Sequence, residues 1–289
     1  MQGTDPGRPD VAIVGQVTVV AWPEQMSLAT TLGEIADMPA TWPGLGRQDP
    51  GPIRLIVVPD VDALQRMTGG RAPAWGAGVA LPGSRTIVIR TDAGDPAGTL
   101  RHELAHLALR RAVRTRMPRW FEEGYASYAA GEWSRLDGLA LNVSVLRGAV
   151  PELDQLDSTL RAGPAAAEAS YALATSAVLD LARRHPTGSL APLLELLRQG
   201  VPWRDAVRRS TGLNPGQFAA AWRRDVRRRY GLLTWMVAGG FWVVMAAAVM
   251  AAAWFRRRQD LPRREALDEG WEIPSPEALA ELDRVPPSE

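Results

Sequence analysis

The chain has 289 residues, of which 46% are hydrophobic, so it is long enough to bury one sizeable core with residues left over. Its 33 basic and 32 acidic residues give a net charge of +1, and we therefore expect no nucleic-acid partner. The absence of cysteine excludes disulfides, thiolate metal ligands and cysteine nucleophiles, but it leaves the cellular compartment open.

The N-terminal part of the chain alternates between strand and helix patterns. β-branched runs predict strands, and apolar residues with helical spacing predict helices between them. We expect strands at 11–20, 53–58, 76–81 and 86–90, and helices at 26–38 and 62–67. The last two strands flank Pro82-Gly83-Ser84, which predicts a hairpin.

Helical patterns dominate from residue 96 onward. Asp95-Pro96 supplies an N-cap and a first-turn proline for a helix at 96–111, and Pro118 opens the next helix in the same way. Further helices are expected at 165–183, 190–198, 203–209 and 215–230. Strands followed by helices predict an α+β fold, with a β-rich subdomain containing a mixed sheet at 1–95 and a helical subdomain at 96–230.

The most informative stretch lies on the helix expected at 96–111. It reads His102-Glu103-Leu104-Ala105-His106, an H-E-x-x-H motif in a chain with only 3 histidines. Imidazoles four residues apart are offset by about 40° around a helix, so both can bind one metal ion. Glu103 lies about 60° from His106, where it can hold a metal-bound water. The alternative is a helix that happens to carry two surface histidines.

A second motif follows, Pro118-Arg119-Trp120-Phe121-Glu122-Glu123-Gly124-Tyr125-Ala126. Catalytic zinc sites commonly use two histidines and one glutamate, and leave a fourth position for water. The two motifs together resemble the gluzincin metallopeptidases, specifically the peptidase MA-like family, in which an HExxH helix is followed by a helix reading W-x-x-E-G-x-A. The resemblance implies that Glu123, directly before Gly124, is the third metal ligand and that Glu122 is turned away.

The resemblance also implies an activity. It predicts a zinc metallopeptidase that binds Zn²⁺ through His102, His106 and Glu123 and cleaves a peptide or protein substrate. In such an enzyme a zinc-activated water attacks the peptide carbonyl, and Glu103 acts as the general base. One alternative is a catalytically weak gluzincin-like binding or scaffold module at the membrane, and another is a zinc hydrolase that acts on non-peptide substrates.

Three further positions are compared with the family pattern. Relatives carry a tyrosine on the helix that faces the site, so the resemblance implies that Tyr171 could stabilise the oxyanion; the alternative is an aromatic residue of the helical core. The strand at 86–90 is expected at the rim of the cleft, where a substrate could add as another strand, or it is an ordinary edge strand. Many gluzincins have an acidic residue one turn after the ligand glutamate, but here that residue is Ser127, which leaves the hydrogen-bond partners of the histidines open.

An apolar segment near the C-terminus predicts a membrane anchor. Residues 232–255 contain no charged residue, and as a helix this segment is long enough to cross a hydrocarbon core of about 30 Å. Trp235 and Trp254 lie near its two ends, where tryptophan suits the interfaces between membrane and water. The alternative is a buried helix of a soluble domain. Equal numbers of arginines flank the segment on its two sides, so the distribution of positive charge does not indicate its orientation. The expectation of an extracytoplasmic catalytic domain therefore rests on the family resemblance. Residues 256–289 are predicted to be a disordered acidic tail in the cytoplasm.

Overall fold

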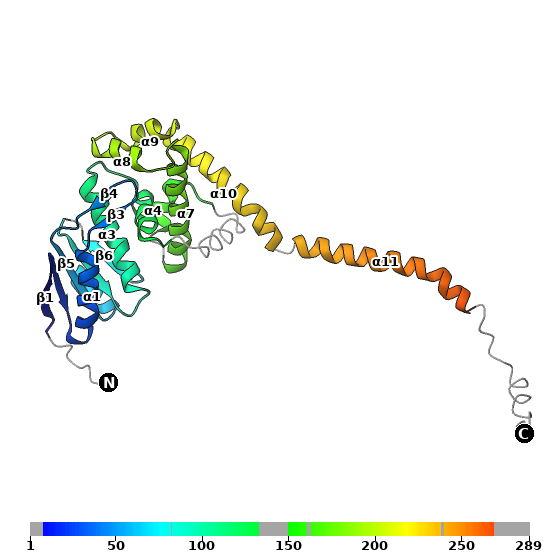
Figure 1. The fold of residues 1–289 in the computed structure, drawn as a ribbon, viewed down its shortest axis with the longest axis horizontal. Coiled ribbons are helices and arrows are strands. Elements are labelled where there is room, and N and C mark those ends of the chain that lie inside the picture. The colour runs from blue at the N-terminus through cyan, green and yellow to red at the C-terminus, as the bar shows by residue number, and fades with distance from the viewer. Residues whose placement is uncertain (1–7, 82, 133–149, 161–162, 238–239, 269–289) are drawn as a thin grey trace, which may run out of the picture. The chain divides into compact units, whose positions relative to one another are not determined.

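The computed structural model describes residues 8–81, 83–132, 150–160, 163–237 and 240–268. The chain divides into two compact units, Met1–Thr234 and Trp235–Glu289. The first unit has an N-terminal sheet followed by helices (Figure 1), so the predicted α+β class is confirmed.

A five-stranded mixed sheet forms the N-terminal part. Its spatial order is β1 (Asp10–Val14), β2 (Val17–Ala21), β5 (Ile53–Val58), β7 (Thr86–Arg90) and β6 (Gly78–Leu81). The three inner strands are parallel to one another, while the two outer strands pair antiparallel to their neighbours. Because β7 has neighbours on both sides, four of its five residues are buried.

Two predictions about the strands are wrong. The single strand expected at 11–20 is the β1–β2 hairpin, because Gly15 adopts a left-handed conformation (φ 53°) and reverses the chain. The strand at 86–90 does not form a rim, because β7 pairs with β5 on one edge and with β6 on the other. The outer strand on this side of the sheet is β6.

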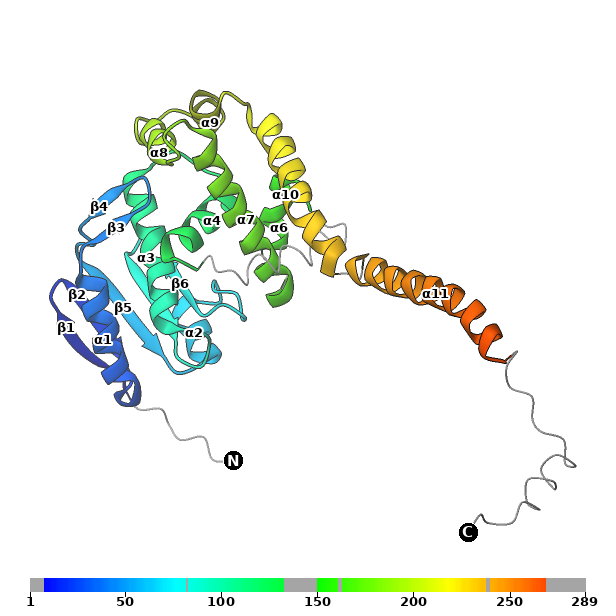
Figure 2. The same ribbon diagram turned by 45° about the vertical axis from the view of Figure 1, so that its right-hand side comes forward.

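Helices cover both faces of the sheet (Figure 2). Helices α1 (Met26–Asp37) and α3 (Pro96–Ala112) pack on one face, and α2 (Val61–Thr68) packs on the other. A two-stranded sheet of β3 (Ala40–Trp42) and β4 (Gly46–Gln48) follows α1. Apolar side chains of β2, β5 and β7 form one core with α1 and α3, so α3 is fixed on the sheet over its buried side.

The helical part packs around α4 (Arg119–Ala130). The other described helices of this part are α6 (Leu153–Thr159), α7 (Pro164–Arg184), α8 (Ala191–Arg198), α9 (Trp203–Thr211) and α10 (Pro215–Val237). Ring centroids of Trp120 and Phe121 lie 5.9 and 4.8 Å from that of Trp203, which joins α4 to α9.

Gly124 allows α4 and α7 to approach closely, and we expect its replacement by alanine to destabilise the fold. A β-carbon at this position would lie 2.5 Å from both the carbonyl carbon and the oxygen of Ala174, and a backbone cannot yield as a flexible side chain can. We expect a loss of about 1–3 kcal/mol in unfolding free energy, measured by chemical denaturation. Gly216→Ala is the control, since its β-carbon would meet only Asn214 Oδ1 at 3.5 Å. Equal stability of the two variants would contradict the packing argument.

The second unit contains α11 (Gly240–Asp268). Within the described part of the chain, Gly240–Gln259 is the one helical stretch that is long and apolar enough to cross a membrane. The apolar residues 232–255, which predict the span, include the end of α10, which reaches Val237, and the beginning of α11. The predicted tail from residue 256 is helical as far as Asp268, since its arginine, alanine, leucine and glutamate residues favour helix. The rest of that tail, residues 269–289, lies outside the described residues.

Candidate metal centre

The HExxH motif lies in the middle of α3. The Asp95 side chain accepts a hydrogen bond from the Ala97 amide and Pro96 occupies the first turn, so the helix begins where its capping residues predict. His102, Glu103 and His106 are all buried, with 9%, 8% and 6% of their surface exposed. Buried polar side chains of this kind need partners, which come from α4, from Glu132 just after it and from β6.

Helix α4 brings Glu123 to the two histidines. Its Oε2 atom lies 3.6 Å from His102 Nε2 and 3.4 Å from His106 Nε2, and the three candidate ligand atoms lie within 4.8 Å of one another. Ligand atoms about 2.0–2.1 Å from a tetrahedral zinc ion lie about 3.3 Å apart. The two separations that involve Glu123 are close to that value, so the donor set fits a metal ion.

Glu122 and Glu123 point in different directions. Glu122 Oε2 accepts a hydrogen bond from Arg110 Nη2 at 3.2 Å on the surface between α3 and α4. Glu123 is 9% exposed and faces the histidines. Successive helical residues point about 100° apart, so the cluster can contain only one of these two carboxylates.

Arg119 contacts the other oxygen of Glu123. Its Nη2 atom lies 3.2 Å from Glu123 Oε1, one helical turn earlier on α4. Burial alone would raise the pKa of Glu123, but hydrogen bonds with His102 and His106 outweigh burial and hold that pKa well below its usual value. Glu123 is therefore an ionised carboxylate with one oxygen toward Arg119 and one toward the imidazoles.

Glu132 provides the acidic partner that the sequence analysis did not find. Both of its carboxylate oxygens lie 3.1 Å from His102 Nδ1. Gly131 ends α4 in a left-handed conformation (φ 77°), which turns the chain so that the next residue reaches back to the site. Burial would raise the pKa of Glu132, but the hydrogen bond to His102 outweighs it and lowers that pKa. Glu132 thus orients the His102 ring, a role the family pattern would give to position 127.

The two carboxylates together keep His102 protonated in the metal-free chain. Burial lowers the pKa of His102, but hydrogen bonds to Glu123 and Glu132 outweigh burial and raise it to about 10. At neutral pH this ring therefore carries a proton that a metal ion must displace, since only neutral imidazole is a ligand.

Zinc binding is therefore expected to release a proton and to tighten with rising pH. The apparent affinity should increase by up to about tenfold per pH unit below a pH of about 10, the pKa of His102. Titration calorimetry at pH 7.5 in two buffers with different ionisation enthalpies measures the released protons. Glu132→Gln removes one carboxylate that raises this pKa and should release fewer protons. Binding enthalpies that do not depend on the buffer would contradict this expectation.

Glu103 contacts the outermost strand of the sheet. Its Oε2 atom accepts a hydrogen bond from the Ala80 amide at 2.6 Å. Ala80 belongs to β6, so this amide points away from β7 and toward α3. The contact holds the Glu103 carboxylate beside both the histidines and the sheet edge.

Two aromatic residues, Tyr171 and Trp75, lie near the candidate metal-binding cluster. The Tyr171 ring, on α7, lies 6.0 Å from the His102 ring and 6.5 Å from that of Trp75, centroid to centroid. Burial and the nearby carboxylates of Glu123 and Glu103 raise the Tyr171 pKa, so its hydroxyl remains a donor. Trp75 precedes β6 and was not singled out from the sequence, because no local pattern marks a residue that reaches the site from a loop.

Comparison with known protein families gives a match for this chain. No curated protein matches the chain. A family model described as the peptidase MA superfamily matches residues 44–228, which include α3, α4 and the whole of the cluster. This match covers more than half of the 289 residues. The chain therefore belongs to the peptidase MA superfamily.

Proposed function

We propose that this protein is a membrane-anchored, zinc-dependent peptidase. The observation that carries the proposal is the convergence of His102, His106 and Glu123 at separations suited to a tetrahedral ion, with the Glu103 carboxylate beside them. Membership of the peptidase MA superfamily supports peptide or protein substrates.

The residues of the cluster have distinct roles in this proposal. His102, His106 and Glu123 would hold the ion, while Glu132 and Arg119 keep His102 and Glu123 in place. Bound zinc would supply a Lewis acid that polarises the substrate carbonyl and makes water acidic. Glu103 takes a proton from the attacking water and passes it to the leaving amine.

Two further groups would act on the substrate. The Tyr171 hydroxyl stays protonated close to His102, and we assign it the donation of a hydrogen bond to the developing oxyanion. We assign substrate backbone pairing to β6 in place of β7, because β6 is the last strand of the sheet and its Ala80 amide lies beside Glu103.

Metal analysis combined with peptide cleavage tests the proposal. The full-length protein is expected to contain about one zinc ion per chain and to cleave members of a broad peptide library, with activity lost on chelation and restored by zinc. Bound zinc without cleavage of any peptide would instead favour a binding or scaffold module. Absence of bound metal after zinc is supplied would reject the metal site itself.

The membrane part of the proposal has its own test. We expect one span within Gly240–Gln259, the catalytic unit outside the cytoplasm and the C-terminus inside. Protease added to intact cells should digest the catalytic unit and spare a tag placed after Glu289. Protection of the catalytic unit, with the protein still in the membrane fraction, would show the opposite orientation.

A further inference from the structure

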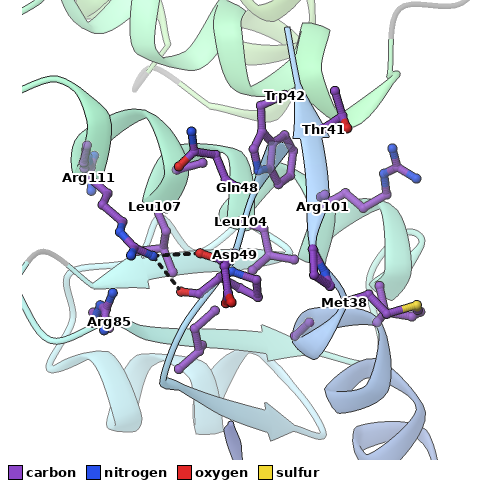
Figure 3. Close-up of a pocket in the computed structure, with 18 of the residues that line it drawn as sticks. Met38, Thr41, Trp42, Gln48, Asp49, Arg85, Arg101, Leu104, Leu107 and Arg111 are labelled. Carbon is purple, nitrogen blue, oxygen red and sulfur yellow. Dashed lines mark hydrogen bonds between the residues drawn. The ribbon is translucent and has the colours of Figure 1, made fainter. Parts of the chain in front are cut away.

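A cavity lies on the side of α3 that faces away from the histidines. It has a volume of about 550 Å³ and is bounded by α1, the β3–β4 sheet and α3 (Figure 3). Its apolar lining includes Ile35, Met38, Trp42, Leu104, Leu107 and Ala108. A volume between about 300 and 1,000 Å³ is typical of sites for small molecules.

The cavity is separate from the metal cluster. On a helix with 100° per residue, the centre of the positions occupied by Leu104, Leu107 and Ala108 lies roughly 170° from the centre of His102 and His106. The two sets of side chains therefore leave α3 on opposite sides, and a molecule in this cavity does not contact the metal ligands.

Two guanidinium groups meet at one end of the cavity. Arg85 Nη2 and Arg111 Nη1 would each lie 3.5 Å from a β-carbon at Gly51. Arg111 Nη1 is fixed by hydrogen bonds to the carbonyl oxygens of Asp49 and Pro50, at 2.7 and 3.4 Å, as the dashed lines in Figure 3 show. The Asp49 carboxylate also lines the cavity, but its Oδ1 atom accepts a hydrogen bond from the Gly51 amide.

These two guanidinium groups have no direct ion-pair partner within the described part of the chain. Neither Arg85 nor Arg111 forms a salt bridge with any carboxylate among the residues that the structure describes. Two neighbouring guanidinium groups without a direct ion-pair partner can bind a carboxylate or a similar planar anion, because each presents several N–H donors in a planar arrangement.

The backbone of Arg85 supports a binding role. Its φ of 49° makes it the one non-glycine residue with a left-handed conformation in the described chain. This position ends the hairpin turn between β6 and β7, where glycine or asparagine would be unstrained. Strain of this kind is typical of ligand-binding positions, and here it is retained by a residue whose guanidinium reaches the cavity.

The apolar part of the lining favours an aliphatic chain over a peptide. Among the described residues, the buried side-chain polar atoms without a hydrogen-bond partner all lie outside this cavity. A peptide backbone placed against Leu104 and Leu107 would leave its own N–H and C=O groups without partners, whereas a hydrocarbon chain has none to satisfy.

We propose that this cavity binds a long-chain carboxylate. The aliphatic chain lies along Leu104 and Leu107 on α3, and the carboxylate is held between Arg85 and Arg111. This site is independent of the metal cluster and of the proposed peptidase activity.

Photolabelling tests the proposal on the full-length protein held in amphipol. The probe is dodecanoate with a diazirine in its chain, and its methyl ester is the uncharged control. We expect saturable labelling by the acid, mapped by mass spectrometry to the segments around Trp42 and Leu107, with half-saturation about tenfold lower than for the ester. Equal labelling by acid and ester, or labelling confined to 240–259, would overturn the proposal.

Arg85→Gly separates loss of the site from loss of the fold. Glycine suits the left-handed backbone, so this variant should unfold at the same or a higher temperature while the half-saturation concentration for the acid rises about tenfold. Arg114→Ala is the matched control, because Arg114 is exposed next to α3 and does not line the cavity. Unchanged labelling in Arg85→Gly, or an equal loss in both variants, would also overturn the proposal.

Discussion

Replacement of Glu103 by glutamine is expected to leave zinc bound and to lower peptide hydrolysis by about 100- to 10,000-fold. The amide oxygen can still accept the hydrogen bond from the Ala80 amide, so the side chain keeps its position beside α3. The amide cannot accept a proton at neutral pH, and the attacking water therefore loses its base. The measurements are kcat/KM on a peptide found by library cleavage, together with the zinc content of the same preparation.

The neighbouring surface glutamate provides the control for this variant. Glu122→Gln makes the same chemical change on α4 at a residue paired with Arg110, so it should retain most of the activity. Substantial turnover by zinc-loaded Glu103→Gln would remove Glu103 from the role of general base. Loss of zinc from Glu103→Gln would instead show that Glu103 helps to hold the metal.

Metal retention should distinguish Glu123 from Glu122. We expect about one zinc ion per chain in the wild type and in Glu122→Ala, and less than about a tenth of that in Glu123→Ala after gel filtration. Loss of any one ligand leaves two protein donors, so His102→Ala and His106→Ala should behave like Glu123→Ala. Zinc content is measured by elemental mass spectrometry on chains shown to be folded by circular dichroism.

The opposite pattern of zinc retention in the two glutamate variants would contradict the assignment of Glu123 as the ligand. If Glu122→Ala lost zinc and Glu123→Ala kept it, the register of α4 taken from the W-x-x-E-G-x-A pattern would be wrong in this chain. Retention of zinc by both histidine variants would place the metal elsewhere.

Features set by neighbouring residues could be predicted from the sequence. Asp95-Pro96 and Pro118 marked the beginnings of α3 and α4 because capping depends on a few adjacent residues. The strand at 53–58 was predicted from its run of apolar residues and matches β5. The H-E-x-x-H spacing indicated that His102 and His106 would face one point, because helical geometry alone fixes that relation.

Features that depend on distant contacts could not be predicted. Glu132 reaches His102 across 30 residues of sequence, and its direction follows from the left-handed turn at Gly131. The outer position of β6 depends on which strands pair across the sheet. Turn residues predict a hairpin, but they do not determine which of its two strands lies at the edge of the sheet. The apolar segment could be recognised in the sequence, but the sequence did not predict that its residues are divided between α10 and α11.

The contact between Arg119 and Glu123 bears on which ion the cluster selects. Because Arg119 contacts Oε1, Glu123 would offer an ion its other oxygen, and the protein donors would then be two imidazoles and one carboxylate oxygen. Calcium and magnesium prefer six or more oxygen donors, often with bidentate carboxylates, and gain little from nitrogen. A low coordination number with mixed nitrogen and oxygen donors suits zinc, so a residue that never touches the metal would narrow the range of ions that bind.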